Sequence, residues 1–295
     1  MSDAFFRTLA RDAAARYKSA GRFAYHFAFG KLTGDPAFAH ILARGLIPDR
    51  SRILDLGCGQ GLMAALLQTA RDRCGNWPAG MSLPPDPVAY CGIDVERRSI
   101  ERAKHAVDGT AGTAHFVCAD IRSVPFDAAD TVILLDVLHY LDYCAQEHLL
   151  RRVCDAMKAG GRMLLRVADE SSTLRFRCTV AIDRVLMTLR GQRIDRLYCR
   201  PVAAWIRMLE AHGFHVTATP MSAGTPFANV LLCARYDAER GNEASPALRV
   251  HDDELPGSRS RTHARCFSRG IERACSVPVR DGRPQHLCRG DSGAR

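Results

Sequence analysis

The sequence lacks any run of 18 or more apolar residues, the length that a membrane-spanning helix needs. It also lacks the pattern of a secretory signal peptide, because Asp3 and Arg7 flank the short apolar patch near the beginning. We therefore expect no membrane span and a cytoplasmic location. The chain of 295 residues has an ordinary apolar fraction of 47% and is long enough to bury a proper hydrophobic core.

No two of the twelve cysteines are separated by only two residues, so the CxxC spacing of zinc and redox sites is absent. Many cysteines lie in apolar segments that are typical of strands, as Cys91, Cys118 and Cys233 do. A free buried cysteine behaves as a small hydrophobic residue. The pattern therefore predicts reduced thiols in the core, with no disulfide framework and no metal site.

A compact basic run interleaved with aromatic residues is absent as well. The net charge of +9 comes mostly from arginines that are spread along the whole chain. A nucleic-acid-binding protein usually gathers its basic residues on one surface or in one segment. We therefore expect no specific nucleic-acid partner.

Two nucleotide-binding motifs are also missing from the glycine-rich segment 57–61. Gly57 and Gly59 begin a Gly-x-Gly-x-x-Gly pattern, but Leu62 stands where the third glycine of a dinucleotide site belongs. No Gly-Lys-Ser/Thr sequence follows, which excludes a P-loop. These absences argue against a nicotinamide-dependent oxidoreductase and against a nucleoside triphosphatase.

The same segment does predict a ligand-binding corner. The apolar run Ile53, Leu54 and Leu56 is typical of a buried strand, and the glycines after it allow a sharp turn that a ligand can approach closely. Good helix formers begin at Leu62, so the turn opens at a helix N-terminus.

Strands and helices alternate after this corner. Further strands are predicted at 88–93, 114–119, 131–135 and 162–167, with helices at 97–107 and 144–157 between them. The glycine pair Gly160-Gly161 is expected to stop the second of these helices. Near-continuous apolar strands with long connections predict an α/β fold, doubly wound around a mostly parallel sheet with helices on both faces. A helix at 201–212 precedes strands at 214–219 and 229–235, whose short connection requires antiparallel pairing. The sheet should therefore have seven strands, the last one antiparallel.

Four aspartates, Asp55, Asp94, Asp120 and Asp136, occur at the carboxyl ends of predicted strands. Parallel strands bring their carboxyl ends to one edge of a sheet, and ligands of such folds bind there. We therefore expect the four carboxylates to lie at the same edge as the glycine turn.

The domain boundaries follow from the composition. Residues 1–50 form a helical leader, whose aromatic stretch 17–29 either packs against the main domain or covers a ligand as a lid. Residues 51–238 form the main domain, with a basic helical insertion at about 170–200. Residues 239–295 have few apolar residues and many arginines, which predicts a disordered basic tail.

The stretch Ile53-Leu-Asp-Leu-Gly-Cys-Gly-Gln-Gly61 resembles the first motif of the class I S-adenosylmethionine-dependent methyltransferases. The resemblance continues through segments 90–94, 117–120, 130–140 and 158–161 and covers roughly residues 50–236. It implies a Rossmann-like fold, S-adenosyl-L-methionine as cofactor and a methyltransferase activity (EC 2.1.1.-).

The resemblance also implies roles for individual residues. Gly57 and Gly59 would offer backbone groups to the ammonium and carboxylate of the cofactor, and Asp55 would steady their turn. Asp94 would accept both ribose hydroxyls, since a carboxylate has two oxygens for a vicinal diol. The remaining cofactor residues that the resemblance implies are the turn residues Cys58 and Gly61, the strand-end residue Asp136, the apolar walls Val95 and Leu138, and, for the adenine, Asp120 and the backbone N–H of Ile121.

Methyl transfer from a sulfonium needs alignment of the nucleophile more than covalent help. His139 is the candidate general base and Tyr140 could position a substrate oxygen, although His139 could instead cap a helix or face the cofactor. Segment 136–139 lacks the Asn/Asp-Pro-Pro-Tyr/Phe sequence of family members that methylate nucleic acids and amides. The resemblance therefore favours a small-molecule acceptor.

The basic insertion hints that this acceptor is acidic or bound to a carrier protein. The alternative interpretation is a noncatalytic module of the same fold that serves a protein or RNA partner.

Deletion of residues 241–295 tests the prediction for the tail. Because this segment has ten arginines and only isolated apolar residues, we expect its removal to leave the melting temperature and cofactor affinity unchanged. Thermal unfolding and ligand titration of the shortened chain would check this. Loss of soluble protein would refute the prediction.

Overall fold

The computed structural model describes residues 1–107, 113–169, 197–222 and 228–237, all of which belong to one compact unit, Met1–Pro256. The helix predicted within the basic insertion and the predicted tail after 239 lie outside the described residues. The fold and the candidate site are therefore built from the leader and the main domain.

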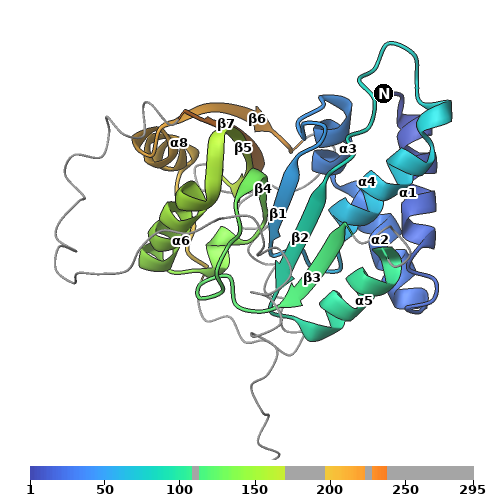
Figure 1. Ribbon diagram of the computed structural model, residues 1–295, viewed down its shortest axis with the longest axis horizontal. Coiled ribbons are helices and arrows are strands. Elements are labelled where there is room, and N and C mark those ends of the chain that lie inside the picture. The colour runs from blue at the N-terminus through green and yellow to red at the C-terminus, as the bar shows by residue number, and fades with distance from the viewer. Residues whose placement is uncertain (108–112, 170–196, 223–227, 238–295) are drawn as a thin grey trace, which may run out of the picture. The chain divides into compact units, whose positions relative to one another are not determined.

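The centre of the fold is a seven-stranded sheet in the order β3-β2-β1-β4-β5-β7-β6 (Figure 1). The strands are β1 Arg52–Leu56, β2 Ala89–Asp94, β3 Ala114–Cys118, β4 Ala129–Leu135, β5 Met157–Ala168, β6 Phe214–Pro220 and β7 Asn229–Tyr236. The first five strands pair parallel, and β7 pairs antiparallel with both β5 and β6. This confirms the predicted α/β fold with an antiparallel last strand.

Helices lie on both sides of the sheet. Figure 1 shows α1, α4 and α5 gathered on one side and α6 and α8 on the other. The described α-helices are α1 Asp3–Ala15, α2 Arg22–Gly34, α3 Pro36–Ala43, α4 Leu62–Asp72, α5 Arg97–Val107, α6 Tyr143–Ala156 and α8 Val202–Ala211. Helix α8 ends as predicted, because Gly213 takes a φ of 86° directly after the C-cap residue His212.

Strand β5 begins five residues earlier than the predicted strand. The predicted helix stop at Gly160-Gly161 is a bend within the strand, where Gly160 has a φ of 76°. Met157 pairs with Ala129 across the sheet, and the register shifts between Ala129 and Thr131. The glycine pair therefore accommodates an irregular register instead of separating a helix from a strand.

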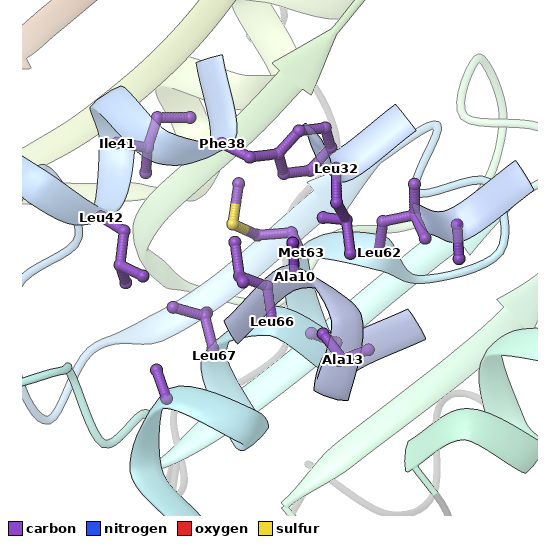
Figure 2. Packing of buried hydrophobic residues seen from close by; sticks show 14 of the residues in the cluster. Ala10, Ala13, Leu32, Phe38, Ile41, Leu42, Leu62, Met63, Leu66 and Leu67 are labelled. Carbon is purple, nitrogen blue, oxygen red and sulfur yellow. The ribbon is translucent and has the colours of Figure 1, made fainter. Parts of the chain in front are cut away.

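The leader packs into the main hydrophobic core. Its aromatic stretch, 17–29, contributes to helix α2. Figure 2 shows apolar side chains of α1, α2, α3 and α4 meeting one another. They are Ala10, Ala13, Leu32, Phe38, Ile41, Leu42, Leu62, Met63, Leu66 and Leu67. These contacts support the interpretation that the leader is a packed part of the domain.

None of the helices in the described part of the chain is both long enough and apolar enough to cross a bilayer.

Leu9 of α1 tests the structural role of the leader. Its side chain is fully buried, so Leu9→Ala should lower the free energy of unfolding by about 2–5 kcal/mol. Leu83→Ala is the matched control, because Leu83 is 67% exposed and should cost less than about 0.5 kcal/mol. Urea unfolding measures both variants. A loss at Leu9 as small as that at Leu83 would show that the leader does not belong to the core.

Candidate functional site

The glycine turn lies between β1 and α4 and faces open space at one position. Gly57 has a φ of 76°, and a Cβ atom added there would lie 2.3 Å from a methyl group of Val137. Gly59 has a φ of 54°, but nothing lies within 4 Å of the place that a Cβ atom would occupy. The turn therefore needs glycine at 57 for packing, whereas the backbone at 59 is open to close approach by a ligand.

The first three amide groups of this turn are already engaged. The N–H groups of Gly57 and Cys58 donate to the carbonyl of Ile93 at 2.7 and 3.1 Å, and the N–H of Gly59 donates to Asp94 at 2.9 Å. The carbonyls of Cys58, Gln60 and Gly61 also accept hydrogen bonds, from the N–H of Gly61 at 2.9 Å, the hydroxyl of Tyr17 at 2.8 Å and the N–H of Ala65 at 3.0 Å. Because a carbonyl oxygen has a second lone pair, the turn can still accept a hydrogen bond from an ammonium group.

Asp94 ends β2 beside the turn. One carboxylate oxygen accepts the N–H of Gly59, and the other accepts the N–H of Glu96 at 2.8 Å. These two bonds fix a half-buried carboxylate at the carboxyl edge of the sheet, and each oxygen keeps further acceptor capacity. The neighbouring Val95 is 56% exposed, so an apolar surface lies next to the carboxylate.

The loop after β3 contains Asp120 and Ile121. Asp120 forms a charged pair with Arg122, whose hydrogen bonds hold the pKa of Asp120 below its usual value. Arg152 of α6 donates to the carbonyls of Ile121 and Arg122, both at 2.8 Å. The loop is therefore held by an arginine that the sequence did not single out.

Asp55 is buried within β1 and accepts a hydrogen bond from the hydroxyl of Tyr90 on β2. Burial raises the pKa of Asp55 to about 7, although the bond from Tyr90 acts in the opposite direction. Asp55 thus links β1 to β2, and its expected role of steadying the glycine turn stays a prediction.

Asp136, directly after β4, belongs to a cluster of four charges that we call the Arg166 cluster: Lys31, Asp35, Asp136 and Arg166. Arg166 of β5 donates through two nitrogens to Asp136 and through the third to Asp35. The Nζ atom of Lys31 lies 2.9 Å from Asp35 and 3.4 Å from Asp136.

Burial alone would raise the pKa values of both aspartates in the Arg166 cluster. The charges of Arg166 and Lys31 outweigh this effect and hold both pKa values below the usual range. The cluster is therefore fully ionised at neutral pH, with two positive and two negative charges.

His139 and Tyr140 lie in the short helix η2, Leu138–Tyr140, with ring centroids 4.1 Å apart. Burial lowers the pKa of His139 to about 4. Its imidazole is therefore neutral at pH 7 and is only a weak base. A cavity of about 10 Å³, with room for about one water molecule, adjoins it. Its lining consists of Leu138, His139, Arg166, Val167, Ala168, Tyr198, Cys199 and Trp205.

Gln146 of α6 anchors the segment that carries His139. Its fully buried amide donates to the carbonyls of Leu138 and Tyr198 at 2.9 and 2.8 Å and accepts from Arg200 at 2.9 Å. The backbone N–H of Tyr198 donates to the carbonyl of His139 at 2.8 Å. The segment that contains Tyr198 and Arg200 is thereby joined to the segment that carries His139.

The leader reaches the glycine turn directly. The hydroxyl of Tyr17 donates to the carbonyl of Gln60 at 2.8 Å, and the Gln60 amide donates to the carbonyl of Ala24 at 3.3 Å. Phe23 of α2 is 70% exposed and packs against Phe27. The leader therefore borders the site, and its proposed use as a lid stays a prediction.

The structure brings the predicted turn residues, Asp94 and Asp136 together at one edge of the sheet. Sequence reasoning did not identify Lys31, Asp35, Gln146 or Arg166. One local signal was available, because Arg166 interrupts the apolar strand Met163-Leu-Leu-Arg-Val167. A charge in a central strand is unusual unless it has a buried partner.

Comparisons with known proteins agree with this geometry. A family model described as a methyltransferase domain matches residues 27–219. Among curated proteins, a carboxy-S-adenosyl-L-methionine synthase of Hydrogenovibrio crunogenus is 27% identical over 42% of this chain and 46% of its own. A 27-O-demethylrifamycin SV methyltransferase of Amycolatopsis mediterranei is 30% identical over 41% of this chain and 40% of its own. The chain thus matches less than half the length of these two relatives.

A solved structure has a similar fold. It is the magnesium protoporphyrin IX methyltransferase of Synechocystis PCC 6803 with bound SAH, at 18% identity and a TM-score of 0.50. The match covers 79% of this chain and 97% of that chain. At this identity the likeness shows the fold.

The raised pKa of Asp55 predicts a pH dependence of stability. The native state holds the Asp55 proton more tightly than the unfolded chain, so the contribution of Asp55 to stability should fall as the pH rises from about 4 to 7, by up to roughly 1 kcal/mol per pH unit. His139 acts in the opposite sense from about pH 4 to 6.5, because its pKa is lowered.

Asp55→Asn isolates the contribution of Asp55, because the amide resembles the protonated acid and does not titrate. In urea unfolding between pH 5 and 8, the natural chain should lose stability relative to the variant as the pH rises, because His139 contributes equally to both chains. If the two stability profiles run parallel, the pKa of the buried Asp55 carboxyl is not raised.

Proposed function

The chain belongs to the methyltransferase domain family, and we propose on this basis that it transfers a methyl group from S-adenosyl-L-methionine to a small-molecule acceptor. The observation that carries the proposal is the juxtaposition of an open glycine backbone at 59 with the carboxylate of Asp94 at the carboxyl edge of a parallel sheet. This is the edge at which ligands of doubly wound folds bind.

The described residues fit the cofactor. The turn offers carbonyl oxygens to an ammonium group, and Asp94 offers acceptor oxygens to hydroxyl groups. In this proposal Val95 forms an apolar wall beside Asp94, and the loop with Asp120 and Ile121 holds the adenine. When bound, the cofactor supplies an electrophilic methyl group on a sulfonium.

The proposed catalytic contribution of the chain is positioning. Because the pKa of His139 is lowered to about 4, its neutral imidazole can accept a hydrogen bond but takes up a proton poorly. We assign to His139 and Tyr140 the task of holding the acceptor atom in line with the methyl group. Alignment of this kind can supply much of the rate enhancement of a bimolecular displacement.

The acceptor is proposed to be a small molecule, either acidic or bound to a carrier protein. Segment 136–139 is Asp-Val-Leu-His and lacks the sequence that accompanies methylation of bases and amides. One of the matched relatives is a methyltransferase whose name specifies a small molecule, 27-O-demethylrifamycin SV. The intact glycine turn and Asp94 favour an enzyme over a noncatalytic binding module.

Binding of S-adenosylhomocysteine tests the cofactor assignment. At a concentration of about 100 times its dissociation constant, it should raise the melting temperature by roughly 5–10 °C. Asp94→Ala should abolish the shift, and Asp94→Asn, which keeps an acceptor for the N–H of Gly59, should weaken it. Asp155→Ala on the exposed surface of α6 is the matched control and should leave the shift unchanged. No shift in the natural chain would remove the assignment.

A further inference from the structure

One arginine of α6 holds the loop that follows β3. This loop, residues 119–128, joins β3 to β4 and contains neither a helix nor a strand. The Nη1 atom of Arg152 donates to the carbonyls of Ile121 and Arg122, both at 2.8 Å, and Nη2 donates to the carbonyl of Val124. A single side chain from a neighbouring helix thus binds successive carbonyl groups of the loop.

The guanidinium of Arg152 is itself held by a ring of the loop. Its central carbon lies 4.3 Å from the centroid of the Phe126 ring. A cation over the face of an aromatic ring is attracted to it, while the N–H groups of a planar guanidinium donate outward in its plane. Phe126 therefore fixes the guanidinium that binds the loop carbonyls.

The loop begins beside the carboxylate that is proposed to bind the ribose. The N–H of Ala119 donates to the backbone carbonyl of Asp94 at 3.0 Å, and the thiol of Cys118 lies 3.5 Å from the carbonyl of Val95. The loop therefore starts at the same edge of the sheet as Asp94, within reach of the same ligand.

The peptide between Asp120 and Ile121 is oriented by the turn that follows it. Its carbonyl accepts the N–H groups of Ser123 and Val124 at 3.1 and 3.0 Å. Because a trans peptide is planar and directs its N–H opposite to its carbonyl, the N–H of Ile121 points away from the turn. This N–H is a donor that faces outward from the loop.

The carboxylate of Asp120 supplies an acceptor next to this donor. Three N–H groups of Arg122, one from its backbone and two from its side chain, donate to the carboxylate. A carboxylate has about four acceptor sites, so one site stays available to a ligand. The loop thus offers one donor and one acceptor on neighbouring residues.

We infer that Arg152 is a positioning residue for recognition of the adenine of the cofactor, an inference that rests on the proposed function. Binding groups on a loop keep their geometry when neighbouring side chains hold the loop, and Arg152 does so here. The Watson–Crick edge of adenine presents the N1 acceptor and the amino donor, which complement the N–H of Ile121 and the carboxylate of Asp120. Arg152 acts through the loop and not on the ligand.

Two probes separate a positioning role from a structural one. The first is S-adenosylhomocysteine, and the second is its deaminated analogue S-inosylhomocysteine. In the analogue an oxygen replaces the amino group and N1 carries a hydrogen, so the donor and the acceptor are exchanged. A loop held in the correct geometry should therefore bind S-adenosylhomocysteine roughly 100-fold more tightly than the analogue, because two hydrogen bonds become two mismatches.

Arg152→Met should reduce this discrimination. Calorimetric titration should show the affinity for S-adenosylhomocysteine falling about tenfold, and the affinity for the analogue changing less than about twofold. Arg152→Lys keeps a donor but not the planar fork, so it should lower the discrimination at least about threefold. It also serves as the second variant if Arg152→Met does not fold, which thermal unfolding without ligand would show.

Arg151→Met is the matched control, because Arg151 is the neighbouring arginine of α6 and is exposed to solvent. This variant should leave both affinities unchanged. An equal loss of affinity for both probes in the Arg152 variants would indicate a merely structural role and overturn the inference.

Two further results would also overturn it. One is a discrimination within about twofold of the natural value in either folded Arg152 variant, and the other is equal binding of the two probes by the natural chain. If the natural chain binds neither probe, the proposed function itself fails, so the two failures can be told apart.

Discussion

The buried guanidinium of Arg166, held between Asp35 and Asp136, is the interaction on which the candidate site depends. Burying a charge is costly unless it is paired and hydrogen-bonded, and removing one partner of such a pair typically costs 3–5 kcal/mol. All three nitrogens of Arg166 are bonded. Because Asp35 belongs to the leader and Asp136 follows β4, the pairing fixes three separate parts of the chain at the carboxyl edge of the sheet.

The geometry of the glycine turn follows from this arrangement. With Asp136 held by Arg166, Val137 lies against Gly57, where only a residue without a Cβ atom fits. Asp35 also caps α3 through the N–H of Ala37 at 3.0 Å, which fixes the leader as it approaches the sheet. Elsewhere in the leader, Tyr17 bonds to Gln60 on the far side of the turn. The Arg166 cluster thus holds the segment that packs against Gly57, and the hydroxyl of Tyr17 holds the turn at Gln60.

Local patterns in the sequence were sufficient for the fold and for part of the site. The strand-turn-helix pattern around Gly57 and the strand-end residue Asp94 depend on neighbouring residues, and the structure brings them together as expected. The Arg166 cluster could not be predicted in this way, because Arg166 and Asp35 are 131 residues apart and no periodicity connects them. The start of β5 was predicted wrongly for a related reason. Gly160 resembles a helix stop in the sequence, but the register with β4 determines its role.

A structure with S-adenosylhomocysteine bound would test most directly whether this edge of the sheet is a cofactor site. The account predicts that the ribose hydroxyls contact Asp94 and that the backbone at Gly59 lies against the ligand. A ligand bound at another part of the sheet, or with its ribose away from Asp94, would contradict the account.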